Sequence, residues 1–70
     1  MIEINGTYYA KDCIKVIEKV LHTRKELKTL AYYFQVIIVI GEINRGEIIY
    51  LETEIEAEKS RKQLIEQLNK

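Results

Sequence analysis

The chain has 70 residues, with eleven basic and eleven acidic side chains, one cysteine and no proline or tryptophan. A chain of this length builds one hydrophobic core, so we expect a single domain over residues 1–70. A single cysteine excludes an intramolecular disulfide framework, and the net charge of zero removes the simplest argument for a nucleic-acid or membrane-surface binder.

The first predicted element is a β-hairpin over residues 2–9. Asn5-Gly6 supplies the two residues with positive φ that a type I′ turn requires. The flanking segments, 2–4 and 7–9, are rich in β-branched and aromatic residues, which favour strands. The chain is therefore expected to open with a short hairpin.

Residues 12–31 admit two interpretations. As a helix that begins near Asp12, the segment places most of its apolar side chains on one stripe with a period of 3.6 residues. As a strand, residues 14–20 extend the sheet and 21–31 form a loop, and Val16 fits this arrangement better than the helix. The pattern alone favours the helix, and the strand plus loop remains the alternative.

Residues 32–53 are predicted to form the central hairpin of a small antiparallel sheet. The segment 32–40 is rich in aromatic and β-branched residues, and Asn44-Arg45-Gly46 is typical of a three-residue hairpin loop. This loop would pair Ile40 with Tyr50 and would make both faces apolar. One face would carry Phe34, Val36, Ile38, Ile40, Ile48 and Tyr50, and the other would carry Tyr33, Ile37, Val39, Ile49 and Leu51.

Residues 54–69 are predicted to form a C-terminal helix. The run Thr53-Glu54-Ile55-Glu56 fits a capping box at its start. Apolar residues further along fall on one helix face, namely Ala57, Leu64, Ile65 and Leu68. The sequence therefore predicts an α+β fold in which this helix packs on one face of the sheet.

The two apolar faces of the central hairpin lead to a prediction about assembly. One helix covers only one face, so the other needs a helix within 12–31 or a partner chain. We therefore expect a homo-oligomer, in the simplest case a dimer, or a protein partner. The candidate interface residues are Tyr33, Val36, Ile37, Val39, Ile49 and Leu51.

No motif in the sequence predicts a catalytic, cofactor-binding or metal site. Cys13 and His22 would lie on opposite sides of a helix, and one cysteine with one histidine cannot build a structural zinc site. The three glycines are isolated, so no phosphate-binding loop is present. We expect a protein that is not an enzyme and needs no cofactor.

A basic region supports the alternative hypothesis, a small nucleic-acid-binding regulator. Tyrosines nearby in the sequence could stack on bases, whereas Glu18 and Glu26 interrupt the positive charge. The candidate residues are Lys11, Lys15, Lys19, Arg24, Lys25 and Lys28.

The order of these motifs resembles small uncharacterised proteins of phages and mobile elements, in which a β-meander is closed by one C-terminal helix. It is more distantly similar to the flagellar-operon FlbD family, relative to which residues 21–31 look like an insertion and a Pro-Asp-Thr segment is missing. The matching positions are Ile4-Asn5-Gly6, Ile14, Ile17-Glu18, Gly46, Ile48 and Glu52-Thr53. The resemblance implies a strand over 14–20 and a non-enzymatic accessory role.

The sequence also predicts where the protein resides. Its longest apolar run, 36–40, is far shorter than the roughly 20 residues of a membrane-spanning helix. Residues 2–6 lack the features of a secretory signal, and a lone thiol fits a reducing compartment. We expect a cytoplasmic protein with no membrane segment.

Overall fold

A computed structural model of the chain describes residues 1–23 and 31–70. Its elements in chain order are β1 (Ile2–Ile4), β2 (Thr7–Tyr9), the 3₁₀ turn η1 (Lys11–Cys13), β3 (Ile14–Ile17), β4 (Leu21–His22), β5 (Tyr32–Ile40), β6 (Ile43–Leu51) and α1 (Glu54–Leu68). Strand β5 is the centre of a four-stranded antiparallel sheet, with β6 along one side and β3 and β4 along the other. The predicted α+β fold is confirmed.

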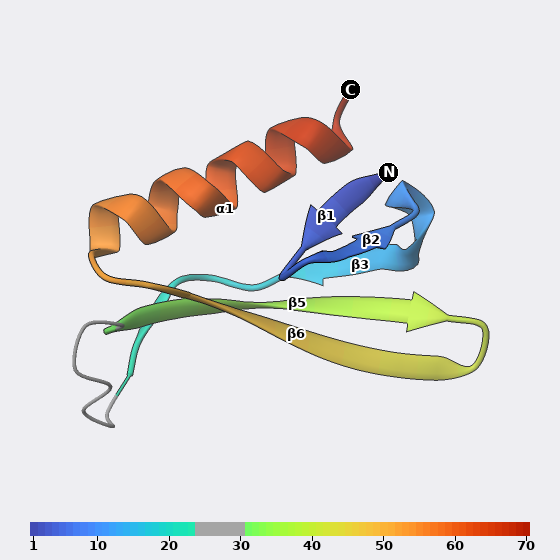
Figure 1. Cartoon of the computed structure of the whole chain (residues 1–70), viewed down its shortest axis with the longest axis horizontal. Helices are drawn as coiled ribbons and strands as arrows, with labels where there is room; N and C mark the ends of the chain where they lie inside the picture. Colours follow the sequence, from blue (N-terminus) through green and yellow to red (C-terminus); the bar gives the residue numbers. More distant parts are fainter. Residues whose placement is uncertain (24–30) are drawn as a thin grey trace.

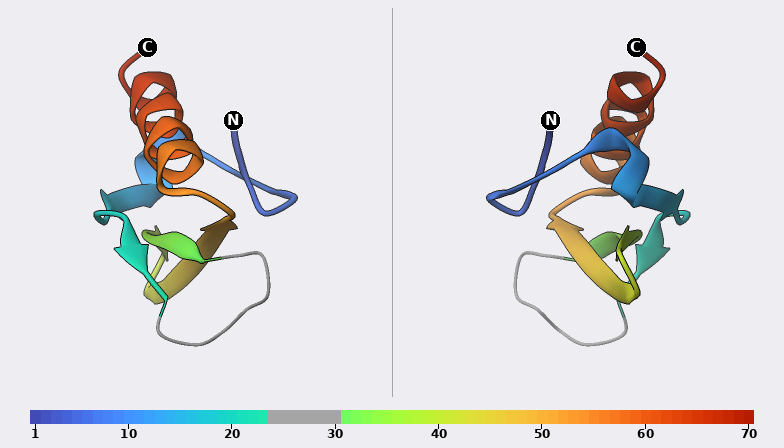
Figure 2. Two further views of the ribbon diagram at one scale, coloured as in Figure 1. Left: turned by 90° about the vertical axis from the view of Figure 1, so that its left-hand side faces the viewer. Right: turned by 90° about the vertical axis from the view of Figure 1, so that its right-hand side faces the viewer.

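Helix α1 and the β1–β2 hairpin lie on the same side of this sheet (Figure 1). Between these elements and the sheet lies the hydrophobic core, in which Phe34, Val36 and Ile38 of β5 are fully buried. The remaining buried core residues come from the two covering elements and are Ile2, Ile4, Tyr9 and Leu64. On the opposite side, no helix or strand of the described ranges lies over the sheet (Figure 2).

The N-terminal hairpin forms as predicted. Ile2 pairs with Tyr9 and Ile4 pairs with Thr7, and the turn residues Asn5 and Gly6 have φ values of 52° and 85°. These positive values are those of a type I′ turn. The hairpin is also joined to the sheet, because Asn5 Nδ2 donates a hydrogen bond of 2.9 Å to the carbonyl oxygen of Ile48.

The helix interpretation of residues 12–31 is wrong for the segment 14–22, which forms β3 and β4. In β3, Ile14 pairs with Ile38 and Ile17 pairs with Val36, with a register shift between Ile14 and Val16. The strand prevails because β5 has a second side to be paired, and because Ile14 and Ile17 pack against the core there. Residues 24–30 of the predicted loop or helix lie outside the described residues.

The register of the central hairpin differs from the prediction. The loop is Gly41-Glu42 rather than Asn44-Arg45-Gly46, and Ile40 pairs with Ile43. Gly41 has a φ of 60° at the first loop position, where a type II′ turn requires glycine. The observed partner of Ile40 is Ile43, whereas the predicted partner was Tyr50, and these two residues are an odd number of positions apart. A register shift by an odd number of residues turns every side chain of β6 to the other face of the sheet.

Helix α1 begins where the sequence predicted and ends one residue earlier, at Leu68. The hydroxyl oxygen of Thr53 accepts a hydrogen bond of 3.1 Å from the amide of Glu56 and so caps the first turn. Ala57 and Leu64 are buried against the sheet. Arg61 fastens the helix to the end of β3, because its Nε donates to the carbonyl oxygen of Glu18 at 2.8 Å.

Candidate functional site

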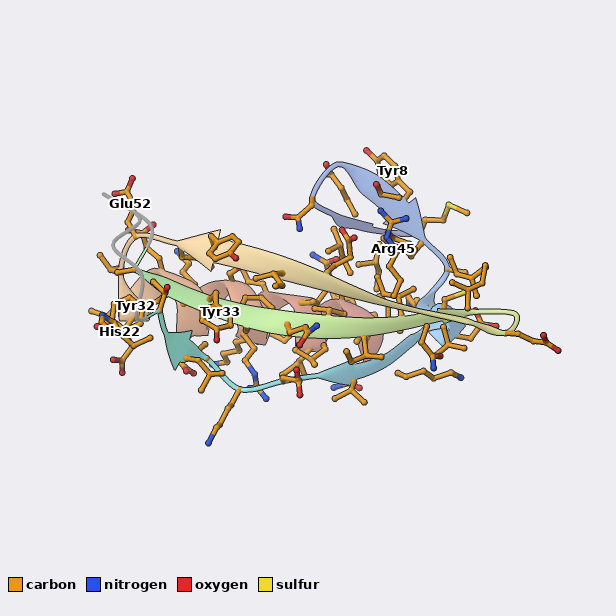
Figure 3. The ribbon with its side chains drawn as sticks, turned by 90° about the horizontal axis from the view of Figure 1, so that it is seen from below. Tyr8, His22, Tyr32, Tyr33, Arg45 and Glu52 are labelled. Carbon is orange, nitrogen blue, oxygen red and sulfur yellow. The ribbon has the colours of Figure 1, made fainter. Side chains whose placement is uncertain are left out.

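The candidate site is the side of the four-stranded sheet opposite α1, which we call the open face. Side chains alternate along β5, so the odd-numbered residues point to this face while Phe34, Val36 and Ile38 point to the core. Pairing then assigns the neighbouring residues of β3, β4 and β6. The open face consists of Val16, Leu21, Tyr33, Gln35, Ile37, Val39, Asn44, Gly46, Ile48 and Tyr50. Figure 3 looks onto this face, with α1 behind the sheet.

The open face is apolar and accessible to solvent. The exposed fractions of Ile48, Tyr50 and Val16 are 38%, 41% and 48%, whereas Phe34, Val36 and Ile38 on the core side of β5 are fully buried. At the hairpin end of the core side, Ile40 and Ile43 are exposed as well. Two strands of nine residues at about 3.3 Å per residue, with the shorter β3 and β4 beside them at about 4.8 Å spacing, give a footprint of at most ~400 Å². A patch of this size is among the largest that soluble monomers expose, and such patches are often functional.

The two long strands put no charged side chain on the open face. On β6, which the structure describes in full, Arg45 and Glu47 alternate to the other face, where Arg45 Nε lies 3.0 Å from Glu47 Oε1. Charges of both signs lie along the β3 margin, where the amide of Glu18 donates to the carbonyl oxygen of Gln35 at 2.8 Å. The centre of the face is therefore electrically neutral.

One end of the open face is aromatic. The rings of Tyr33 and Tyr50 lie with centroids 5.9 Å apart at an interplanar angle of 44°, and Leu21 pairs with Tyr33 on the neighbouring strand. Tyrosine is enriched among the residues that dominate protein–protein binding energy, because it buries a large rigid ring and keeps a polar tip. This cluster therefore has the composition of an interface.

A glutamine occupies the middle of the open face. Gln35 pairs with Ile48, and its side chain lies over Gly46, where a Cβ atom would collide with Gln35 Nε2. Gly46 does not have a positive φ, so the backbone does not require glycine at this position. Within residues 1–23 and 31–70, the carboxamide of Gln35 has no hydrogen-bond partner.

The edges of the sheet are less suited to binding than its face. On the outer edge of β6, the carbonyl oxygen of Ile48 already accepts a hydrogen bond from Asn5 Nδ2. The Arg45–Glu47 ion pair on the same strand points to the core side, and charged side chains of this kind discourage the pairing of another strand. The opposite edge is interrupted by the irregularity between Ile14 and Val16 and by the break between β3 and β4. Both edges therefore carry features that oppose strand addition.

The structure divides the predicted interface residues between the two faces. Tyr33, Ile37 and Val39 lie on the open face. Val36 is fully buried, and Ile49 and Leu51 pack against the core because of the register difference. The sequence analysis therefore missed the contributions of β3, β4 and β6, although a turn at Gly41 would have placed Ile48 and Tyr50 correctly.

The predicted basic region is described only in part. Lys11, Lys15 and Lys19 are exposed, and Lys11 Nζ donates to the carbonyl oxygen of Lys70. The other three predicted residues, Arg24, Lys25 and Lys28, lie outside the described residues. The described part of the region thus has acidic Glu18 between its lysines and one lysine bound to the C-terminal residue.

The other predicted chemistry-bearing residues are not brought together. Cys13 is half-buried against the core, while His22 is exposed on β4 with its ring 4.8 Å from that of Tyr32. A shallow groove on the core side is lined by Glu3, Ile49, Ser60, Gln63, Leu64 and Gln67. In the described ranges no three histidine, cysteine or acidic residues are grouped so as to hold a metal ion.

In the part of the chain that the structure describes, no helix combines the length and apolarity needed to span a bilayer. Comparison of the chain with protein-family models, curated proteins and solved structures finds no match. The resemblance to phage proteins and to the FlbD family remains a prediction.

Proposed function

We propose that this chain is a small binding protein that works as a homodimer, with the open faces of two copies stacked on each other. The observation that carries the proposal is the unequal cover of one sheet. The middle of its core face is fully buried at Phe34, Val36 and Ile38, while the open face exposes Val16, Ile48 and Tyr50 to solvent. The accessory role implied by the sequence resemblance belongs to this proposal, so the dimer acts by binding rather than by catalysis.

The chemistry of the open face favours a second copy as its occupant. In a two-fold dimer the same patch meets itself, so a patch with charges of one sign would repel its copy. The open face has no charged side chain on β5 or β6, and the charges along its β3 margin have both signs. The two long strands therefore contribute no like-charge repulsion when two copies approach face to face.

The size of the open face sets the expected affinity. Two stacked faces would bury roughly 800 Å² in total, which is the size of a weak or transient interface. We therefore expect a dissociation constant in the micromolar range. Burial of this surface also adds stability to a chain that is small enough to need it.

Sedimentation equilibrium of Ile48→Lys against the wild type tests this proposal. The wild type should show a monomer–dimer equilibrium at micromolar concentrations. Lysine at position 48, which is exposed on the edge strand, should leave the monomer folded and raise the dissociation constant by about 100-fold or more, because a charge would be buried against an apolar face. The matched control is Ile55→Lys on α1, where the residue is 81% exposed and off the open face, and this variant should dimerise like the wild type.

Two results would contradict the proposal. One is a folded wild-type monomer of 8.3 kDa at all these concentrations. The other is an intact Ile48→Lys dimer, which would place the contact elsewhere. A monomer that binds duplex nucleic acid with a steep loss of affinity at high salt would favour the basic region instead.

A further inference from the structure

Gln35 is a polar side chain near the middle of the proposed dimer interface. It lies between Tyr33 and Ile37 on the open side of β5 and opposite Ile48 of β6. Its side chain is half-buried, and its carboxamide has no hydrogen-bond partner among the residues that the structure describes. Stacking of a second copy would remove water from this group and leave its polar atoms needing partners.

A second carboxamide is the partner that a two-fold dimer supplies most directly. A glutamine amide carries both donors and an acceptor, so two of them can exchange reciprocal hydrogen bonds. A two-fold axis brings each residue near it to its own copy. We infer that the two-fold axis passes beside Gln35 and that the two Gln35 carboxamides pair across it, an inference that rests on the proposed homodimer.

Gly46 gives this pair its room. The Gln35 side chain lies over Gly46 instead of standing away from the sheet, which a Cβ at position 46 would prevent. Face-to-face sheets pack about 10 Å apart, and two side chains that lie low on their own sheets fit this spacing. The backbone conformation at Gly46 does not require glycine. The effect of glycine at this position is therefore to leave room for the Gln35 side chain above it.

Such a pair would fix the register of the two copies. An apolar patch alone permits several sliding positions, because hydrophobic burial has no direction. A buried polar pair is satisfied in only one of them, as a single buried asparagine sets the register of some coiled coils. Gln35 is therefore proposed as a determinant of how the two copies are aligned.

The test is the pH dependence of dimerisation in Gln35→Glu. The substitution keeps the shape of the side chain but places two carboxylates against each other at the axis. At pH 7.5 we expect a dissociation constant about 100-fold above that of the wild type, because like charges meet in a buried site. Burial and the facing carboxylate raise the pKa of the introduced carboxyl in the dimer, so the difference from wild type should disappear as the pH falls to about 5.

Comparing Gln35→Glu with the wild type at each pH removes the contribution of the native titratable groups to the pH dependence of dimerisation. The charged or titratable groups on or beside the open face are Tyr33, Tyr50, Lys15, Glu18, Lys19 and His22. The matched control is Gln63→Glu, the same change at an exposed position on α1, which should follow the wild type at every pH. Circular dichroism checks that each variant is folded.

Cross-linking locates the axis independently. In a Cys13→Ala background, Gln35→Cys should give a covalent dimer with a short bismaleimide, while Val39→Cys, nearer the end of β5, should give far less. If Gln35→Glu dimerises like the wild type at pH 7.5 or cross-linking is stronger at position 39, the axis is misplaced and the inference fails, while a monomeric Ile48→Lys still supports the homodimer. If the wild type is a monomer, the proposed function fails and this inference fails with it.

Discussion

The two faces of the four-stranded sheet differ in cover more than in composition. On β5, Val36 and Ile38 are fully buried under the covering elements, while Ile37, which lies between them in sequence, faces the uncovered side. A sheet with one wetted side normally alternates apolar and polar residues, and this strand does not. Strand β5 is thus largely apolar on both sides, whereas the described part of the chain covers one of them.

Each face also carries a polar group without a hydrogen-bond partner in the described part of the chain. In the core it is the hydroxyl of Tyr9, whose side chain is 5% exposed and whose oxygen has no partner among the described residues. On the open face it is the carboxamide of Gln35. The first group is enclosed within one copy, while the second stands where a second copy can reach it.

The largest expected contrast between the faces comes from placing the same charge on each of them. Val36→Lys should unfold the chain, because the ammonium group would be buried in the core without a partner. Val39→Lys should remain folded and weaken only the dimer. Far-UV circular dichroism and sedimentation equilibrium of the two variants measure this contrast. A folded Val36→Lys variant would show that Val36 does not lie on the buried core face.

Truncation of the covering helix tests how firmly the core face is held. Leu64→Ala should lower the free energy of unfolding by about 2–5 kcal/mol, because Leu64 is only 7% exposed. Leu68→Ala should cost less, since Leu68 is partly exposed near the helix end. Urea denaturation gives both values, and equal costs at the two positions would mean that α1 packs differently along its length.

The smallest effect is expected at the unpartnered hydroxyl of the core. Tyr9→Phe should leave the free energy of unfolding unchanged or raise it by up to about 1 kcal/mol, because it removes a buried polar atom that forms no hydrogen bond with any residue that the structure describes. The dimer dissociation constant should not change. A loss of more than about 1 kcal/mol in urea denaturation would show that the hydroxyl has a partner, such as a buried water molecule.

Local signals in the sequence were sufficient for the elements at the two ends of the chain. Asn5-Gly6 and the Thr53 cap each fix a turn or a helix start through neighbouring residues, and both were predicted correctly. The segment 14–22 was ambiguous because a short apolar run fits a helix as well as a strand. This segment forms strands because β5 has a second side that can be paired. Such a contact between distant residues cannot be read from a local sequence pattern.

The open face could be predicted only in part because it depends on the hairpin register. The sequence predicted the turn at Asn44-Arg45-Gly46 and the structure turns at Gly41-Glu42, and the two positions give opposite assignments for every residue of β6. The turn at Gly41 pairs the full length of the two strands, and it leaves Gly46 within a strand, beneath the Gln35 side chain. The length of the ladder therefore outweighed the stronger loop signal of Asn44-Arg45-Gly46.

The position of α1 in the chain has a consequence for folding of the protein. All six strands that the structure describes precede the helix, so the sheet depends for its cover on the last element of the chain. A sheet on which α1 has not docked would expose apolar side chains on both sides, a condition that favours association with other partly folded chains. Variants that weaken the docking of α1 are therefore expected to accumulate as aggregates in cells, and lower synthesis temperature or a chaperone should rescue their yield more than that of open-face variants.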